Sequence, residues 1–261
     1  ALAAKAKINT QSQAYQLQAR ANRFPIAHIV RGIPVGPFSG SIQATGRHFD
    51  VLSAYATLRA NLRAEALQYD RYDLSGLHLE ANLHGGRAWA DINMNNPLLQ
   101  MIKDTLVLGT DLDLHFKTNQ KLTAYSLNGS LRNNHIITPK IHAQAKDIYL
   151  DFGTNRDTTT AMLSAGDLYL NLGAKGDVPY LTRHITHFAT ELNKELQSYN
   201  LDQEKLKTIL PHINLKLRAG QDNPLYNLAH LKGYTFNSAY VDLCANPTIG
   251  MTGDARMGSI Q

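Results

Sequence analysis

The sequence has little cysteine and no long apolar run. Cys244 is the only cysteine among 261 residues, so no intramolecular disulfide can form. It falls at the end of an alternating segment where a small apolar residue would serve, and we expect a buried thiol there rather than a nucleophile. No run of about 18 or more apolar residues is present, which argues against a membrane-spanning helix in this sequence.

Charge is also sparse and scattered. Charged residues make up 18% of the chain, and the net charge of +5 is spread in ones and twos rather than gathered in a run. A nucleic-acid binder usually shows a basic stripe, so we do not expect nucleic acid as a partner. The chain opens at ALAAKAKIN, without an initiator Met and already in alternation, which suggests a piece cut from a longer protein.

Enzymatic signatures are missing from the sequence. There is no phosphate-binding loop, nucleophile elbow, dinucleotide glycine fingerprint, HExxH or paired cysteine motif. We therefore predict a non-enzymatic protein without cofactor or metal, while an enzyme stays open as a third alternative. Three groups of side chains are weak site candidates. His184 and His187 could share a metal ion, but no acidic or Cys ligand is spaced to complete the site. His78 with His84, and Asp104 with Asp111 and Asp113, are better explained as solvated polar faces of strands.

A period-two alternation of apolar and polar residues dominates the chain. From Tyr72 to Asn95, two alternating arms flank Gly85-Gly86, whose freedom at positive φ suits a tight hairpin turn. The longest regular segment, 54–66, alternates completely, which favours a strand over the helix that its Ala, Leu and Arg content would also allow. Such segments recur about every ten residues, which predicts an antiparallel meander.

Three segments break the alternation. The prolines of 24–38 predict an irregular or edge segment, and 98–102 is expected to form one helical turn or a loop. Helices are predicted from about Pro179 to Tyr199, from Asp202 to Leu210 and from about Asn223 to Gly233. The organisation expected is a mainly β meander over 1–176, a helical insert with one intervening strand over 177–232, and further strands over 233–261.

A sheet of many strands with one apolar face must close, pair with a second sheet, or fold so that the face lines a groove. From spacing alone a dry core or sandwich is the simpler expectation. The inward set leans on Ala and Leu, however, and small residues leave room for a groove that takes acyl chains. The predicted lining is Ala56, Leu58, Ala60, Leu62, Ala64, Leu77, Leu79, Ala81, Leu83, Ala90, Ile92, Met94, Leu112, Leu114, Leu168 and Leu170, and the predicted groove-covering helix residues are Leu181, Ile185, Phe188 and Leu192.

The sequence resembles repeats in the TamB and AsmA-like proteins of the Gram-negative envelope. The resemblance rests on Gly40 to Asp50, the strand 54–66, the start at Tyr72 to Leu77, and Leu127 to Leu131. The helical insert, with Leu210-Pro211, Ala219-Gly220 and Asn223-Pro224-Leu225, is most similar to the large TamB-type proteins of the Bacteroides group.

The resemblance implies a long β-sheet folded into an open U, or β-taco, with an apolar inner face. It implies a periplasmic protein anchored in the inner membrane, which supports outer-membrane biogenesis, protein secretion or phospholipid transport between membranes. Its partners would be phospholipids and, through segments not in this sequence, an outer-membrane assembly protein. The alternative is a closed β-sandwich or scaffold that binds envelope proteins or glycans.

Overall fold

The fold is mainly β, with antiparallel strands and few helices, as predicted. The computed structural model describes residues 1–28, 34–50, 53–70, 72–94, 98–102, 106–119, 121–137, 142–199, 201–231 and 233–260. Contacts group them into a first unit, 1–122 with 127–147, and a second unit, 123–126 with 148–261. The division after residue 147 falls inside the segment expected to be one meander. In neither unit does the sheet close, which argues against the closed-sandwich alternative.

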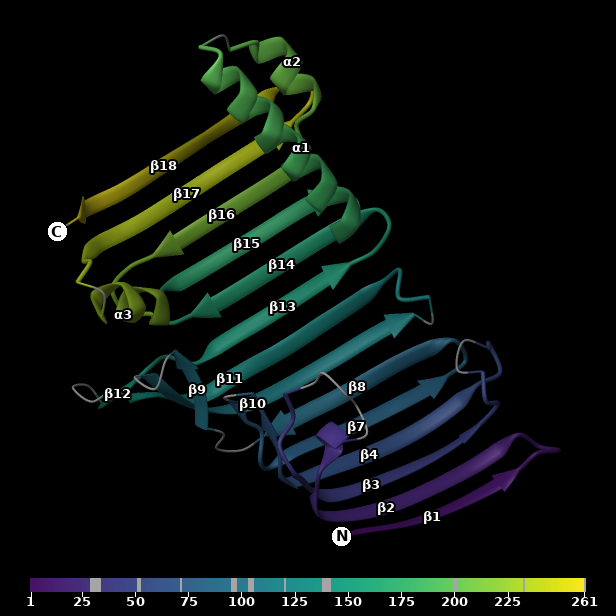
Figure 1. Cartoon of the computed structure of the whole chain (residues 1–261). Helices are drawn as coiled ribbons and strands as arrows, with labels where there is room; N and C mark the ends of the chain where they lie inside the picture. The colour runs from purple at the N-terminus through teal and green to yellow at the C-terminus, as the bar shows by residue number, and fades with distance from the viewer. Residues whose placement is uncertain are drawn as a thin grey trace. The chain divides into compact units, whose positions relative to one another are not determined.

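The first unit is a single antiparallel sheet with short additions at one end of its strands (Figure 1). Its main strands pair in the order β1–β2–β3–β4–β7–β8–β10. Their bounds are Leu2–Asn9, Ala14–Phe24, Phe38–Arg47, Thr57–Ala66, Leu77–His84, Arg87–Met94 and Leu106–Asn119. The long strand β11 (Tyr125–Ile137) follows β10 in the sheet, and all but its first two residues belong to this unit. The short additions are β5 (Gln68–Tyr69), β6 (Tyr72–Asp73), β9 (Leu98–Ile102), β12 (His142–Gln144) and the 3-10 helix Ile26–His28.

The predicted hairpin is confirmed in its turn and in its register. Gly85 and Gly86 have φ values of 56° and 73°, a backbone conformation that strains residues with a Cβ. The two arms pair from Leu77↔Met94 to His84↔Arg87, so apolar residues stand opposite apolar residues along the whole hairpin.

Two predictions of secondary structure were wrong. The strand expected from residue 54 begins at Thr57, because Ala56 N donates to Ser53 O at 2.9 Å and closes a turn first. Residues 98–102 form the strand β9 rather than a helical turn or loop. Pairing with β10 gives this short segment the hydrogen bonds that five isolated residues could not supply.

The second unit is a six-stranded antiparallel sheet in chain order. Its strands are β13 (Ile148–Thr154), β14 (Thr158–Ala165), β15 (Leu168–Lys175), β16 (Ile213–Ala219), β17 (Phe236–Asn246) and β18 (Gly250–Ile260). The predicted helices are confirmed as α1 (Val178–Gln197), α2 (Gln203–Thr208) and α3 (Pro224–Leu231), with β16 between α2 and α3. In the described ranges, no helix combines the length and apolar character needed to cross a bilayer.

The expectation of a buried Cys244 was wrong. Cys244 pairs with Asn214 and Thr252, so it lies on the polar face of the second sheet, while its neighbours Leu243 and Ala245 lie on the apolar face. Its side chain is only half-buried. The strict alternation of β17 decides its side, since a one-position shift moves a residue to the opposite face.

A charged network joins α1 to α2. The carboxylate of Glu195, only 7% exposed, accepts hydrogen bonds from Asp202 N at 2.8 Å and from Lys205 Nζ at 3.1 Å. Glu191 accepts from Lys194 at 2.6 Å and from Lys205 at 3.0 Å. Hydrogen bonds from Lys194 and then Lys205 lower the pKa of Glu191 from 4.5 to about 2.

A buried amide holds the start of α3 against the turn between β14 and β15. Asn223 is 1% exposed and caps α3 by accepting from Tyr226 N at 2.8 Å. Its Nδ2 donates to Asp167 Oδ1 at 2.6 Å and to Gly220 O at 2.9 Å. Burial alone would raise the pKa of Asp167, but hydrogen bonds from Asn223 and the backbone of Asp222 and Gly220 outweigh it, so the pKa is lowered.

Replacing Asn223 by Ala should destabilise the second unit. The change removes a helix cap and leaves Asp167 without its shortest hydrogen bond, so we expect a loss of about 2 kcal/mol in the free energy of unfolding. Urea denaturation followed by circular dichroism measures it. The exposed Asn193→Ala on α1 is the control and should change stability by less than about 0.5 kcal/mol. Equal losses for the two variants would contradict this role.

Acid should loosen the contact between α1 and α2. Because the folded pKa of Glu191 lies below its ordinary value, its stabilising contribution is present above pH 4.5 and is lost as the pH falls toward about 2. The protection factors of the α2 amides, which remove the pH dependence of intrinsic exchange, should therefore fall between about pH 5 and pH 2.

In Lys205→Met the loosening of α2 should begin at higher pH, since one of the two lysines that lower the pKa of Glu191 is gone. Glu204→Gln, an exposed change in the same helix, should leave the profile unaltered. If the pH dependence of α2 protection is the same in the native protein, Lys205→Met and Glu204→Gln, the network does not hold the helices together.

Candidate functional site

The apolar face of the first unit is continuous across seven strands. Residues that pair across neighbouring strands form rungs, and over most of this face the register sets apolar residues of β1 to β10 opposite apolar residues of the next strand. Three neighbouring rungs make up most of the face. The upper ridge is Ala4, Ala19, Ile42, Leu62, Leu79, Ile92 and Leu114; the floor is Ala6, Leu17, Ala44, Ala60, Ala81, Ala90 and Phe116; the lower ridge is Ile8, Tyr15, Gly46, Leu58, Leu83, Ala88 and Thr118.

The floor rung is lower than the ridges beside it. Ala44, Ala60, Ala81 and Ala90 follow one another on β3, β4, β7 and β8, and their side chains end at Cβ. On β4 and β7, Leu side chains stand on both sides of this row, so the three rungs form a trough that runs across the strands. At about 3.4 Å per residue, the two ridges are roughly 14 Å apart. At about 4.8 Å per strand spacing, the row of four alanines is also roughly 14 Å long, and Leu17 and Phe116 stand in the floor at its two ends.

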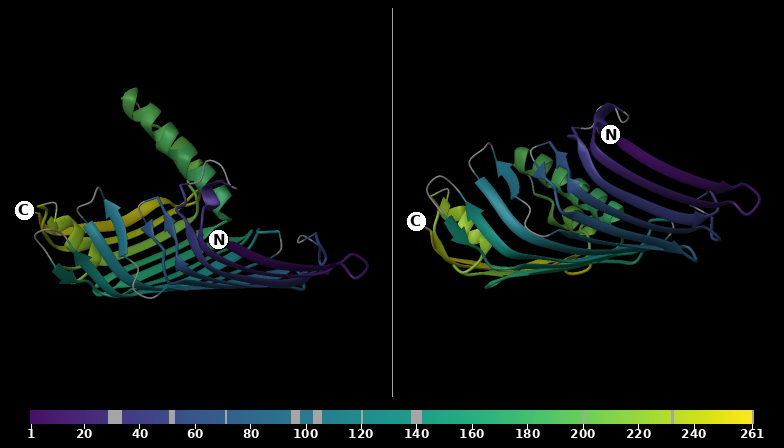
Figure 2. Two further views of the ribbon diagram at one scale, coloured as in Figure 1. Left: turned by 60° about the horizontal axis from the view of Figure 1, so that its bottom comes forward. Right: turned by 90° about the horizontal axis from the view of Figure 1, so that it is seen from below.

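At one end of the strands the apolar face is covered by a buried hydrophobic cluster. The neighbouring part of the face, which holds the trough, is not covered in this way. Ala21, Phe38 and Ala64 form a buried cluster with Phe24, Ile26, Ile42, Leu62, Leu67 and Leu77 packed against it. Figure 2 shows the strands bending toward the side on which the 3-10 helix lies. The floor and ridges are only half-buried or exposed, and near β1 Leu17 is 38% and Ile8 is 65% exposed.

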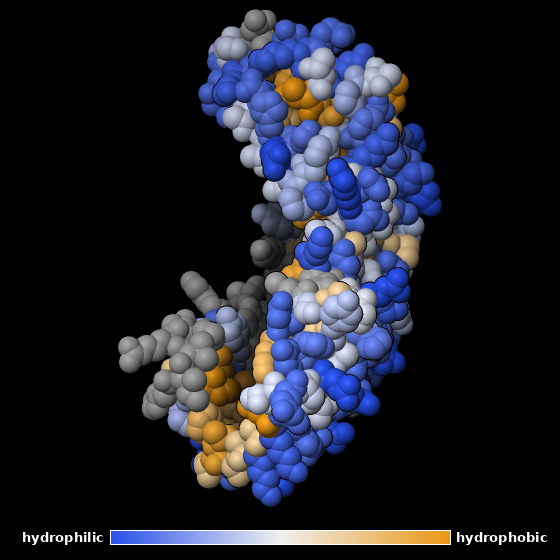
Figure 3. Space-filling model, turned by 90° about the vertical axis from the view of Figure 1, so that its right-hand side faces the viewer, coloured by the Kyte–Doolittle hydropathy of each residue, from blue (hydrophilic) through white to orange (hydrophobic). Residues whose placement is uncertain are grey.

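The surface view agrees with this division of faces. In Figure 3, hydrophobic residues gather along one side of the part of the molecule that holds β1 to β4, and the neighbouring surface is largely hydrophilic. Among the described residues no second sheet covers this apolar face. Exposed apolar patches of this kind mark interaction sites in soluble proteins.

The structure places most of the predicted groove residues together. Leu58, Ala60, Leu62, Ala64, Leu77, Leu79, Ala81, Leu83, Ala90, Ile92, Met94, Leu112 and Leu114 share the apolar face of the first unit. Ala64 and Met94 belong to its buried end, at 3% and 2% exposure, and Ala56 is buried in the turn before β4 rather than on the strand. Leu168 and Leu170 lie in the second unit.

The second unit repeats the one-sided pattern. Leu170 pairs with Leu163 and Leu217, and Leu168 is buried with Ala165 and Ala219. The predicted covering helix α1 buries Leu181, leaves Phe188 and Leu192 half-buried and exposes Ile185 by 45%. Figure 2 shows α1 projecting away from the strands, so its role as a cover stays a prediction.

Part of the trough was missing from the predicted lining. Ala6, Ala19, Ala44 and Ile42 come from β1 to β3, and Phe116 comes from β10. Their alternation is plain in the sequence, but only the pairing register shows that they continue the same rungs. The register also shows that Ala residues of different strands meet in one row.

The comparisons with known proteins give no family. No protein-family model, curated protein or solved structure matches the chain.

The polar candidates lie on the opposite faces of the sheets. His115 Nδ1 donates to the carboxylate of Asp91, its partner across the strands, at 2.7 Å, and His115 Nε2 lies 3.5 Å from Asp113 Oδ1. The hydrogen bond to Asp91 raises the pKa of His115. Asn61 contacts both His78 and Glu80 at 3.0 Å, and Asp111 accepts from Asn133 at 2.6 Å. These are cross-strand polar contacts, and Asp104 lies outside the described residues.

The histidine pairs are not brought together as sites. His184 stacks on Tyr180 at 4.0 Å, and its buried Nδ1 has no hydrogen-bond partner among the described residues, while His187 is exposed. His78 and His84 lie at opposite ends of β7. Within the described part of the chain, no three His, Cys, Asp or Glu side chains are grouped so that they could hold a metal ion.

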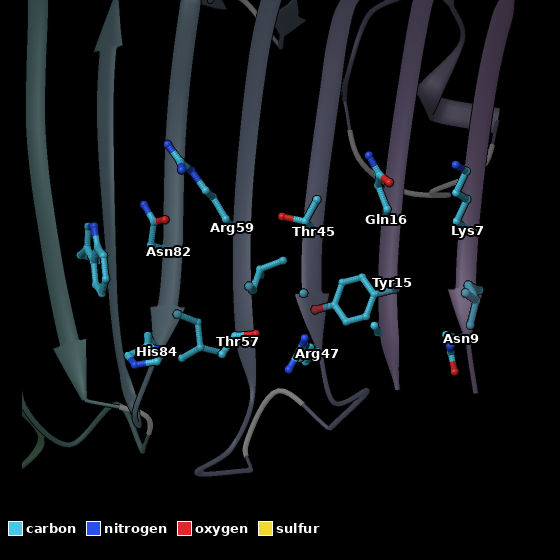
Figure 4. A pocket seen from close by; sticks show the side chains of 16 residues that line it. Lys7, Asn9, Tyr15, Gln16, Thr45, Arg47, Thr57, Arg59, Asn82 and His84 are labelled. Atoms are coloured by element: carbon cyan, nitrogen blue, oxygen red, sulfur yellow. The ribbon is translucent and has the colours of Figure 1, made fainter. Parts of the chain in front are cut away.

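A cationic pocket lies on the polar face of the first sheet, at the strand ends nearest the lower ridge. Figure 4 shows Lys7, Gln16, Thr45, Arg59 and Asn82 in a row across five strands, and Arg47 contributes from the next polar rung. The pocket has a volume of about 630 Å³, and no carboxylate is among the residues that line it. Basic residues that are scattered along the sequence are therefore gathered by the fold.

Two alanines of the same strand should respond differently to enlargement. Ala64→Gln places a polar side chain in the buried cluster and should cost about 2 to 3 kcal/mol in the free energy of unfolding. Ala60→Gln lies on the half-open floor and should cost less than about 1 kcal/mol. Thermal denaturation of both variants measures the difference, and an equal loss at the two positions would mean that the trough is a packed core.

Proposed function

We propose that the first unit binds phospholipid acyl chains in its trough, as part of a non-enzymatic protein of the periplasm that carries lipids between membranes and supports outer-membrane biogenesis. The observation that carries the proposal is the row of small residues between two apolar ridges, half-open along its length. Such a surface offers apolar contact to a long, flexible ligand and no group that would do chemistry on it.

The dimensions of the trough support an acyl chain as its ligand. The hydrocarbon core of a bilayer is about 30 Å thick, so one extended lipid chain spans roughly 15 Å. The row of alanines, roughly 14 Å long, is therefore close to the length of one extended chain. The half-buried state of the ridges means that a bound chain would remove further apolar surface from water, at about 25 cal/mol per Å².

The cellular part of the proposal rests on the resemblance to TamB and AsmA-like proteins. The open antiparallel sheets and the apolar face agree with what that resemblance implies about fold. Periplasmic location, an inner-membrane anchor and an outer-membrane assembly partner come from the resemblance alone and are proposed on that basis.

Photo-crosslinking should separate the two faces of one hairpin. A photoreactive amino acid at Leu62, Leu79 or Ile92 should label phospholipid in cells or in vesicle extracts, because these side chains form the upper ridge. The same group at Asn61 or Glu80, one position away on the polar face, is the control and should label at least tenfold less. Mass spectrometry of the crosslinked protein identifies the lipid.

The enlarged floor supplies a second measurement. Ala60→Gln should keep the fold and lower the amount of phospholipid that remains bound after mild purification. Equal labelling from both faces, together with unchanged lipid in Ala60→Gln, would sink the proposal.

A further inference from the structure

Positively charged side chains gather at one set of strand ends in the first unit. These are the ends at which β1 stops and β2 starts. Register brings Lys7 and Arg59 into one polar rung and Arg47 into the next, and both rungs line the cationic pocket. All three side chains are exposed, and none forms an ion pair within the described part of the chain. A surface that holds cations without neutralising carboxylates raises the local concentration of anions.

Exposed aromatic and aliphatic side chains stand at the same strand ends. On the connection from β3 to β4, Phe49 is 51% and Tyr55 is 78% exposed. Phe49 stacks on Tyr15 with ring centroids 6.1 Å apart, and Tyr15 lies over Gly46, where a Cβ would collide with its ring. Ile8, the first residue of the lower ridge, is 65% exposed. The lower ridge of the trough therefore borders strand ends that carry aromatic rings, while the cations project from the opposite face at the same ends.

We infer that this cationic rim, defined by Lys7, Ile8, Arg47, Phe49, Tyr55 and Arg59, docks on the surface of an anionic phospholipid bilayer. Lys and Arg contact lipid phosphates, while Phe49 and Tyr55 enter the headgroup region, where amphipathic and aromatic side chains are stable. The docking places the lower ridge of the trough next to the level from which acyl chains leave the bilayer. This last step rests on the proposed lipid binding, whereas the docking itself does not.

The mixture of residue types favours a bilayer over a nucleic acid. A polynucleotide would use the cations and could stack on the rings, but it offers no apolar phase for Ile8. A bilayer interface takes all three kinds of side chain at once.

Flotation with lipid vesicles tests the docking. The purified chain should float with vesicles of phosphatidylcholine and phosphatidylglycerol at 7:3, and more weakly with phosphatidylcholine alone, at ~50 mM salt. The triple variant Lys7→Glu, Arg47→Glu, Arg59→Glu should lower the partition coefficient on anionic vesicles about 100-fold. The matched control Arg156→Glu, Lys175→Glu, Arg183→Glu changes the net charge equally in exposed positions of the second unit and should lower it less than about threefold.

The aromatic residues are tested by Phe49→Ser with Tyr55→Ser, which should weaken binding to both vesicle types at high salt. Circular dichroism confirms that each variant is folded. If both triple variants lose the same affinity, the effect is net charge alone and the rim is not a docking site. If the protein binds a single-stranded oligonucleotide through Lys7, Arg47 and Arg59 but does not float, the partner is a nucleic acid and the inference is overturned.

The two proposals fail in distinguishable ways. Rim variants that no longer float should still contain phospholipid after mild purification, because the floor and ridges are unchanged. If the purified protein contains no phospholipid and takes none up from vesicles, yet still floats, the acyl-chain proposal is overturned and the docking stands. Lipid-loaded protein that fails to float on anionic vesicles, even in its native sequence, would overturn the docking and leave the trough as a lipid site.

Discussion

The pairing register is the constraint on which the first unit depends. Side chains alternate between the two faces of a strand, so a slip of one residue in any pair would turn the apolar set of that strand toward the polar side. From Ala4↔Ala19 through Leu62↔Leu79 to Ile92↔Leu114, seven strands keep the same phase. Turns such as Gly85-Gly86 fix the count between neighbouring strands. Both the trough and the cationic rim follow from this one agreement.

A face built in this way gives up part of the stability that a covered core would supply. Buried apolar surface contributes about 25 cal/mol per Å², and the half-open floor and ridges collect only part of it. The closed end compensates locally, since Phe38 and Ala64 are buried against Ala21 with several further apolar residues around them. The remaining stability comes from the continuous hydrogen-bonded ladder, which an open sheet retains in full. Ala60 and Ala64, four residues apart on one strand, thus belong to different environments.

Alternation made the faces of the strands predictable, and the arrangement of the strands much less so. The face of Leu79 or Ile92 follows from period two alone, and the helix from Val178 follows from its apolar stripe and from Pro179. The row formed by Ala44, Ala60, Ala81 and Ala90 required pairings between segments far apart in the chain. The segment 98–102 was misassigned because its hydrogen bonds come from β10, which local pattern does not contain. For Cys244 the local alternation with Leu243 and Ala245 already gives the polar face, and the small size of the residue was the wrong guide.

The same limit applies to charge. Along the sequence Lys7, Arg47 and Arg59 are separated by 40 and 12 positions and form no basic run, yet the antiparallel order brings them to neighbouring rungs at one set of strand ends. A strand that sends Ile8 to one face necessarily sends Lys7 to the other. Edge strand β1, with all eight residues exposed, therefore combines an apolar and a cationic side in one element. An element of that kind matches the boundary between phosphate and hydrocarbon, where both of its sides find their preferred surroundings.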